Sequence, residues 1–146
     1  MLSGPYLWVI AVREGIFLNI SYVKADPGGN TTILVLDAVP ASRRAAVAGA
    51  ILACPDLAAE QVGYIRFPAG AENGVRIDMM GGEFCGNAAR SAAAYALSLS
   101  GREKGRYDVS CSGYEGLLTT VVERTGNRTY KVCIDMPLPK SITALR

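Results

Sequence analysis

One run of small residues limits how this chain can fold. Residues 86–99 are rich in alanine, and Arg90 is the only charged residue among them. Alanine has the highest helix propensity, so the run predicts a helix, which Gly101 is well placed to end. Because the side chains of this helix are small or apolar on every side, we expect it to be buried on every side. Other elements of the fold must therefore enclose it.

The rest of the chain has the pattern of short strands. Eight segments are enriched in β-branched and aromatic residues and are separated by turn residues. They are residues 6–12, 16–24, 31–37, 62–67, 75–80, 107–112, 117–123 and 129–135. A second helix is predicted over 41–53, before Pro55, which cannot continue a helix interior. Its apolar face would consist of Ala46, Val47, Ala50 and Ile51.

Eight short strands and one fully buried helix predict an α+β fold. We expect a strongly curved, mostly antiparallel sheet that wraps around one central helix. A length of 146 residues fits one domain, which we place at residues 17–146, with residues 1–16 as an N-terminal extension or an extra strand. Half of the residues are hydrophobic. Composition leaves open whether a core, a partner domain or a dimer face buries them.

Charge and cysteine content argue against several classes of function. The net charge is +2 and basic residues are spread along the whole chain, so we expect no nucleic-acid binding. We also expect no membrane span, because no apolar stretch is long enough. The cysteines form no Cys-x-x-Cys pair and histidine is absent, which argues against a metal site and a Cys–His dyad. Nothing marks secretion, so we expect a cytoplasmic protein with reduced thiols.

Cys85 differs in its setting from the other cysteines. It lies in residues 81–87, Gly-Gly-Glu-Phe-Cys-Gly-Asn, directly before the helix that we expect to be buried. Backbone N–H groups and the helix dipole at such a position stabilise a thiolate, so Cys85 is a candidate base. An isolated cysteine is usually a small buried hydrophobe, and we interpret Cys54, Cys111 and Cys133 in that way.

Two stretches resemble motifs of one enzyme family. Residues 79–91, Met-Met-Gly-Gly-Glu-Phe-Cys-Gly-Asn-Ala-Ala-Arg-Ser, resemble the Cys-Gly-Asn motif of the diaminopimelate epimerase family of amino-acid racemases and epimerases. Residues 27–37, Pro-Gly-Gly-Asn-Thr-Thr-Ile-Leu-Val-Leu-Asp, are similar to the family's N-terminal Gly-Asn, apolar strand and Asp. Residues 135–137, Asp-Met-Pro, are similar to the segment that closes the first half of these enzymes. The compact form of the cysteine motif resembles the branch that includes histidine racemases of opine-metallophore pathways.

The resemblance implies a fold, a mechanism and a set of site residues. Each half of such an enzyme is a curved sheet around one helix, and each half contributes one cysteine of an acid–base pair that inverts Cα. No cofactor and no metal is needed. By the motif match, Cys85 would be catalytic, while Asn30, Gly86 and Asn87 would bind the amino-acid substrate.

The second motif of the family, Gly-Cys-Gly-Thr, does not occur in this chain. We therefore expect an N-terminal half that is inactive without a C-terminal half and that forms a homodimer through the face left uncovered. Another class of function stays open, namely a non-catalytic domain of the same fold that binds a small ligand or an anion, or self-associates. The Cys-Gly-Asn motif argues against a third alternative, an isomerase of this fold with a carboxylate base.

Overall fold

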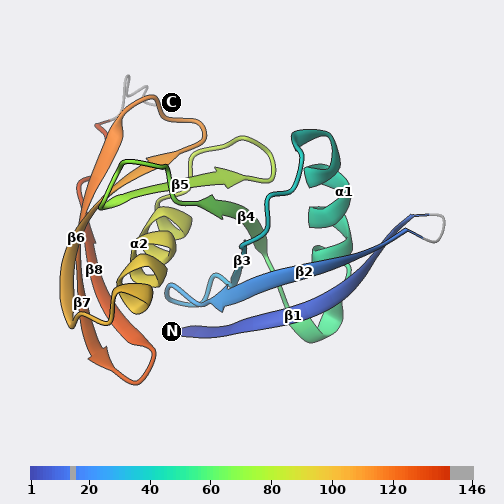
Figure 1. Ribbon diagram of the computed structural model, residues 1–146, viewed down its shortest axis with the longest axis horizontal. Coiled ribbons are helices and arrows are strands. Elements are labelled where there is room, and N and C mark those ends of the chain that lie inside the picture. Colours follow the sequence, from blue (N-terminus) through green and yellow to red (C-terminus); the bar gives the residue numbers. More distant parts are fainter. Residues whose placement is uncertain (14–15, 139–146) are drawn as a thin grey trace, which may run out of the picture.

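The computed structural model describes the main chain of residues 1–13 and 16–138 (Figure 1). It describes the side chains of the same residues except 7–18. In this part of the chain, eight strands form one sheet in the order of the sequence. The strands are β1 (Leu2–Arg13), β2 (Ile16–Ala25), β3 (Thr32–Val35), β4 (Gln61–Arg66), β5 (Gly74–Met79), β6 (Lys104–Cys111), β7 (Leu117–Gly126) and β8 (Thr129–Ile134). The helices are α1 (Ala41–Leu52), the short 3-10 helix η1 (Pro55–Leu57) and α2 (Gly86–Ser100).

Parallel pairings explain where the helices occur along the chain. Within the described sheet, β3 pairs with β4 and β5 pairs with β6 in parallel, while the other neighbouring strands are antiparallel. Parallel neighbours need a crossover connection. The first crossover contains α1 and the second contains α2. The prediction of a mostly antiparallel sheet is confirmed.

The sheet curls until its first strand contacts its last hairpin. The N–H of Leu2 in β1 donates to the carbonyl of Arg128, in the turn between β7 and β8, over 2.9 Å. Helix α2 lies on the concave side, next to β5 through β8, whereas α1 lies beside β2, β3 and β4 (Figure 1). This arrangement confirms the expected α+β fold, a curved sheet around one central helix.

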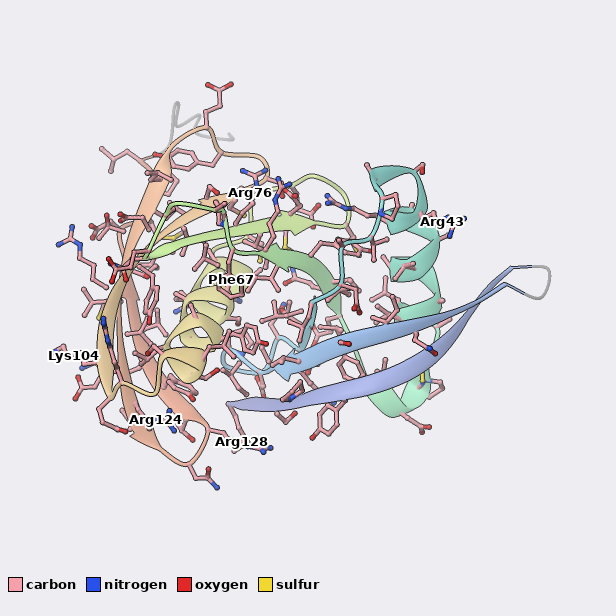
Figure 2. The ribbon with its side chains drawn as sticks, viewed as in Figure 1. Arg43, Phe67, Arg76, Lys104, Arg124 and Arg128 are labelled. Atoms are coloured by element: carbon pink, nitrogen blue, oxygen red, sulfur yellow. The ribbon has the colours of Figure 1, made fainter. Side chains whose placement is uncertain are left out.

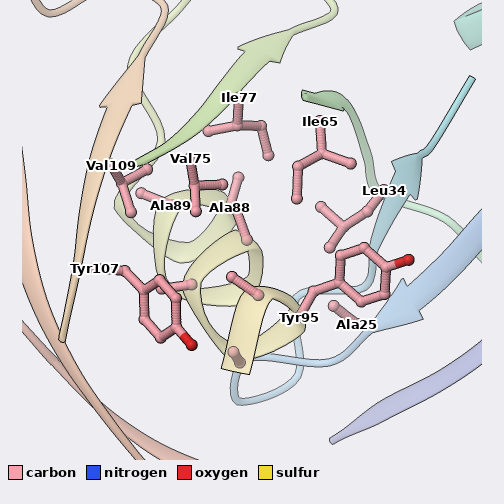
Figure 3. Packing of buried hydrophobic residues seen from close by; sticks show 14 of the residues in the cluster. Ala25, Leu34, Ile65, Val75, Ile77, Ala88, Ala89, Tyr95, Tyr107 and Val109 are labelled. Carbon is pink, nitrogen blue, oxygen red and sulfur yellow. The ribbon is translucent and has the colours of Figure 1, made fainter. Parts of the chain in front are cut away.

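Helix α2 is the centre of the larger hydrophobic core. Its buried residues are Ala88, Ala89, Ser91, Ala92, Ala93, Ala94, Tyr95, Ala96 and Leu97. Around them pack strand residues that include Leu34, Ile65, Val75, Ile77 and Val109 (Figure 3). Because alanine side chains are short, the strands approach the helix closely on several sides and fill the space at the density of a protein interior. The alanine run therefore explains why the sheet can wrap around this helix.

A second core lies between α1 and the outer face of β2, β3 and β4. Val47, Ala48 and Ile51 are the buried residues of α1. The predicted face of this helix was wrong in part, because Ala46 is exposed and Ala48 is buried. Alanines occur all around α1, so apolarity alone does not choose its face. The larger Val47 and Ile51 decide the orientation because they bury more apolar area.

Strand β1 begins at Leu2, earlier than the predicted start at residue 6. The added residues include Pro5, which cannot donate a hydrogen bond to a neighbouring strand. Strand β1 pairs only with β2 in the described sheet, and proline is tolerated in such an edge strand.

The basic side chains labelled in Figure 2 come from different elements and point to different sides of the molecule. They are Arg43 of α1, Arg76 of β5, Lys104 of β6, Arg124 of β7 and Arg128 of the last turn. These residues form no single stripe. None of the helices in the described ranges combines the length and the apolar character that a membrane crossing requires.

Candidate active site

Cys85 is the N-cap residue of α2. Its backbone is extended, with φ −138° and ψ 108°, and its Sγ accepts a hydrogen bond from the N–H of Ala88 over 3.4 Å. The first N–H groups of a helix have no partner within the helix, and an N-cap side chain normally satisfies one of them. A half-buried sulfur atom therefore takes the place that an oxygen usually has at a helix start.

A glutamine that the sequence motifs do not mark contacts the same sulfur. Gln61 begins β4, and its Oε1 accepts hydrogen bonds from the Cys85 thiol over 3.3 Å and from the Thr32 hydroxyl over 3.4 Å. Thr32 and Gln61 are register partners in the parallel pair of β3 and β4. The predicted strand began at residue 62 and so omitted this residue. The available signal was its position in the chain. Gln61 begins β4, which pairs with β3, and β3 follows Asn30.

Asn30 lies in the loop between β2 and β3. Its Oδ1 is buried and has no hydrogen-bond partner among the described residues. Its main-chain oxygen lies 3.4 Å from the Thr32 hydroxyl and shares the single proton of that hydroxyl with Gln61 Oε1. Buried side-chain acceptors are normally paired, so an unpaired one suits a donor that arrives with a ligand. Thr32 contacts both Asn30 and Gln61 and thereby connects Asn30 to the surroundings of Cys85.

A cavity of about 500 Å³ opens beside Cys85. Its lining consists of Phe84, Cys85, Gly86, Asn87, Arg90, Ile134 and Met136. The three consecutive motif residues 85–87 thus share one cavity, whereas Asn30 and Gln61 are not part of its lining. A volume of this size is in the usual range of small-molecule sites.

The start of α2 offers groups that suit an anion. Gly86 and Asn87 are the first two residues of the helix, so their backbone N–H groups lack partners within it. Such groups bind carboxylates readily. The side-chain oxygen of Asn87 accepts a hydrogen bond from Arg90, so this arginine pairs within the helix. Gly86 leaves room for Met136, because a Cβ at Gly86 would lie 3.0 Å from the Met136 Cε.

Comparison with known proteins adds a family to this geometry. Residues 19–146 match the family described as Histidine racemase CntK N-terminal domain. The chain belongs to this family.

Curated proteins that are similar to this chain are named histidine racemases. The protein from Fusobacterium nucleatum subsp. nucleatum strain ATCC 23726 is 33% identical over 136 residues, which are 89% of this chain and 48% of that protein. The protein from Staphylococcus aureus strain Mu50 is 32% identical over 104 residues, which are 70% of this chain and 38% of that protein. The chain spans about half the length, or less, of these curated relatives.

All four cysteines of this member of the histidine racemase CntK N-terminal domain family are free. The three thiols other than Cys85 differ in exposure. Burial raises the pKa of the Cys111 thiol, and the neighbouring Cys85 backbone and Ser112 side chain offset part of that rise. Cys54 is half-buried and packs against the second core. Cys133 is exposed, so the interpretation as a buried hydrophobe was wrong there. It lies in β8, an edge strand in which every second residue faces solvent.

The described residues contain no group of three or more acidic or cysteine side chains that could hold a metal ion.

Proposed function

We propose that this chain is the N-terminal half of a cofactor-independent amino-acid racemase in which Cys85 is one of two acid–base groups. One observation carries the proposal, namely that the Cys85 sulfur lies between the N–H of Ala88 and the Gln61 amide, at the wall of a cavity of about 500 Å³. We propose histidine as the first substrate to test, because the relatives are named histidine racemases.

In the proposed reaction, the Cys85 thiolate removes the α-proton from one face of the amino acid. The Cα–H bond breaks, an S–H bond forms, and the electron pair stays on Cα and spreads into the carboxylate. A thiol from the C-terminal half then gives its proton to the opposite face of Cα, which inverts the centre. Each turnover leaves a proton on Cys85 and a thiolate on the second sulfur, which is the state that starts the reverse reaction. Before another turnover in the same direction, Cys85 loses its proton to water and the second sulfur takes one up.

The neighbouring residues have distinct roles in this proposal. The N–H groups of Gly86 and Asn87 bind the substrate carboxylate and stabilise the charge that develops there. The unpaired Oδ1 of Asn30 does not line this cavity, and we propose that it accepts a hydrogen bond from the substrate ammonium group where the site extends toward the loop between β2 and β3. Gln61 orients the Cys85 sulfur. An amide can accept from a thiol through its oxygen and, when it is turned over, donate to a thiolate through its nitrogen.

Exchange of the α-proton of histidine in deuterated water tests the proposal. The chain joined to the C-terminal half of the Fusobacterium nucleatum relative should exchange this proton, as followed by proton NMR. The intact relative is the positive control. Cys85→Ser should lower the exchange rate of the histidine enantiomer whose α-proton faces Cys85 by a factor on the order of a thousand, and Cys54→Ser should leave it unchanged.

Undiminished exchange of that enantiomer in Cys85→Ser would contradict the mechanism. We expect the chain without a C-terminal half to show no racemisation, because only one face of Cα then has an acid–base group. Binding of histidine without any exchange by the joined protein would instead favour the alternative, a small-ligand-binding module.

A further inference from the structure

Four consecutive residues that the proposed reaction does not use lie beside the loop that carries Cys85, and three of them contact it. This loop, residues 80–85, connects β5 to α2 and is called the cysteine loop below. The four residues, 111–114, form the end of β6 and the beginning of the turn toward β7 and are called the supporting turn.

Ser112 connects the end of β5 to the middle of the cysteine loop. Its hydroxyl donates to the carbonyl of Glu83 over 2.8 Å and accepts from the N–H of Met79 over 2.8 Å. Its own N–H donates to the carbonyl of Ile77 over 3.0 Å, which ties the supporting turn to β5. Ser112 is buried. A buried hydroxyl that pairs with two main-chain groups fixes their separation, because an unpaired buried group is unfavourable.

Gly113 and Tyr114 contact the middle of the cysteine loop. A Cβ at Gly113 would lie 2.3 Å from the backbone nitrogen of Phe84 and 2.7 Å from the carbonyl carbon of Glu83. Gly113 also has a φ of +73°, which favours glycine. The ring of Tyr114 packs against the ring of Phe84, with centroids 6.0 Å apart. Any side chain at position 113 therefore has to displace the loop.

Cys111 is buried in the hydrophobic core that Cys85 packs against, and the Cys85 backbone offsets part of the rise that burial causes in the pKa of the Cys111 thiol. Glu83 and Phe84, the two residues directly before Cys85, are thus each contacted by residues of the supporting turn. These contacts hold residues 83 and 84 in place, and the main chain of these residues determines the position of the Cys85 sulfur.

We propose that the supporting turn, with Ser112 at its centre, is the positioning element that holds the Cys85 sulfur at the start of α2. Displacement of residues 83–85 would move the sulfur away from the N–H of Ala88 and from Gln61. The consequence for catalysis rests on the proposed function of Cys85, since a misplacement of about 1 Å can cost a factor on the order of a hundred in rate. The reactivity of the Cys85 thiol, which depends on its position, can be measured in the chain itself.

Alkylation by iodoacetamide tests this inference, with each cysteine followed by mass spectrometry. The readout is the ratio of the Cys85 rate to that of exposed Cys133, which lies on β8. Ser112→Ala and Gly113→Ala should lower this ratio by roughly threefold to tenfold, because the displaced sulfur loses the helix N–H that supports the reactive thiolate. Ser112→Thr keeps the hydroxyl and should keep the ratio.

Gly70→Ala is the matched control for Gly113→Ala. Gly70 has a φ of +78°, but a Cβ there meets no atom within 4 Å. Both variants carry the strain of an alanine at positive φ, and only Gly113→Ala pushes on the cysteine loop. The ratio should therefore stay unchanged in Gly70→Ala. Thermal unfolding of each variant shows that the ratio is measured on folded protein.

A ratio that stays unchanged or rises in Gly113→Ala or in folded Ser112→Ala would show that the supporting turn has a structural role only, and would overturn the inference. A fall in Ser112→Thr equal to that in Ser112→Ala would overturn the role of the hydroxyl. If Ser112→Ala does not fold, the comparison of Gly113→Ala with Gly70→Ala decides whether the supporting turn positions the Cys85 sulfur. Proton exchange by the joined protein tests the role of Cys85 separately, so either idea can fail alone.

Discussion

Among single residues, Asn30 combines an energetic cost with a candidate role in binding. Its buried Oδ1 has no partner among the described residues. An unpaired buried acceptor costs about 1–3 kcal/mol relative to a paired one. Natural proteins retain such groups where function needs them, at the expense of stability. A ligand that donates a hydrogen bond to Asn30 would remove the cost.

Replacement of Asn30 by alanine should therefore stabilise the ligand-free chain. We expect Asn30→Ala to raise the free energy of unfolding by about 1 kcal/mol, because the unpaired oxygen is removed. Urea denaturation measures this difference. Exposed Asn73 provides the control, since Asn73→Ala should change stability by less than about 0.5 kcal/mol. A clear loss of stability in Asn30→Ala would mean that its amide is paired in the folded chain.

At the scale of elements, α2 depends on small side chains because strands approach it closely. Ala92 has no exposed surface and lies in the middle of the helix. Ala92→Leu adds apolar volume without space to receive it, so we expect a loss of about 1–3 kcal/mol in the free energy of unfolding. Ala45→Leu, on the exposed side of α1, makes the same change and should alter stability by less than about 0.5 kcal/mol. Equal effects of the two variants in urea denaturation would contradict tight packing around α2.

At the scale of the whole molecule, one carboxylate joins α1 to the sheet. Asp78 of β5 lies 3.1 Å from Arg44 of α1, 3.4 Å from Arg66 of β4 and 2.5 Å from Arg76 of β5. The Tyr64 hydroxyl donates to the carbonyl of Arg44 over 2.5 Å, and burial raises the pKa of Tyr64 to about 12. These contacts fix the start of α1 on the outer face of the sheet.

The acid stability of the chain should depend on Asp78. Burial alone raises the pKa of its carboxyl, but Arg76, Arg44 and Arg66 outweigh burial and hold that pKa below its usual value of 3.8. A lowered folded-state pKa contributes stability above the unfolded value, and this contribution is lost as the pH falls through the folded value.

We therefore expect Asp78→Asn to lower the free energy of unfolding at pH 7 by about 2–3 kcal/mol. This loss is smaller than that expected for a fully buried ion pair, because the Arg66 side chain is mostly exposed to solvent. The gap between the native chain and Asp78→Asn should narrow below about pH 4, where the native carboxyl becomes protonated in the unfolded chain and then in the folded one. Urea denaturation at several pH values measures this gap. Exposed Glu72 provides the control variant Glu72→Gln. A gap that is independent of pH would exclude the ion pairs as its cause.

The face around Cys85 should make the chain self-associate. Met136 and Leu138, which follow β8, are 54% and 90% exposed, and Met136 lines the cavity beside Cys85. Exposed apolar patches favour association, so sedimentation velocity should show a dimer that grows with concentration. The double variant Met136→Lys and Leu138→Lys should weaken it at least about tenfold, because a buried charge is unfavourable. Leu99→Lys, at the far end of α2, should not. A strict monomer at high concentration would contradict this prediction.

The sequence by itself determined the features that depend on neighbouring residues. The alanine run specified a buried helix, and Pro55 and Gly101 lie just after the predicted helices. Segments rich in β-branched and aromatic residues, separated by turn residues, located the eight strands. These signals are local, because helix and strand propensities act over a few positions. The predicted setting of Cys85, before a helix, was read in the same way.

The tertiary structure alone decided which distant residues meet around that cysteine. Gln61 lies 24 positions from Cys85 and reaches it through the register of two parallel strands. Ser112 lies 29 positions from Glu83 and meets it because β5 and β6 are neighbours. Such contacts depend on how strands pair and how far the sheet curves. A shift of one residue in register turns every side chain to the opposite face, and no local pattern shows that register.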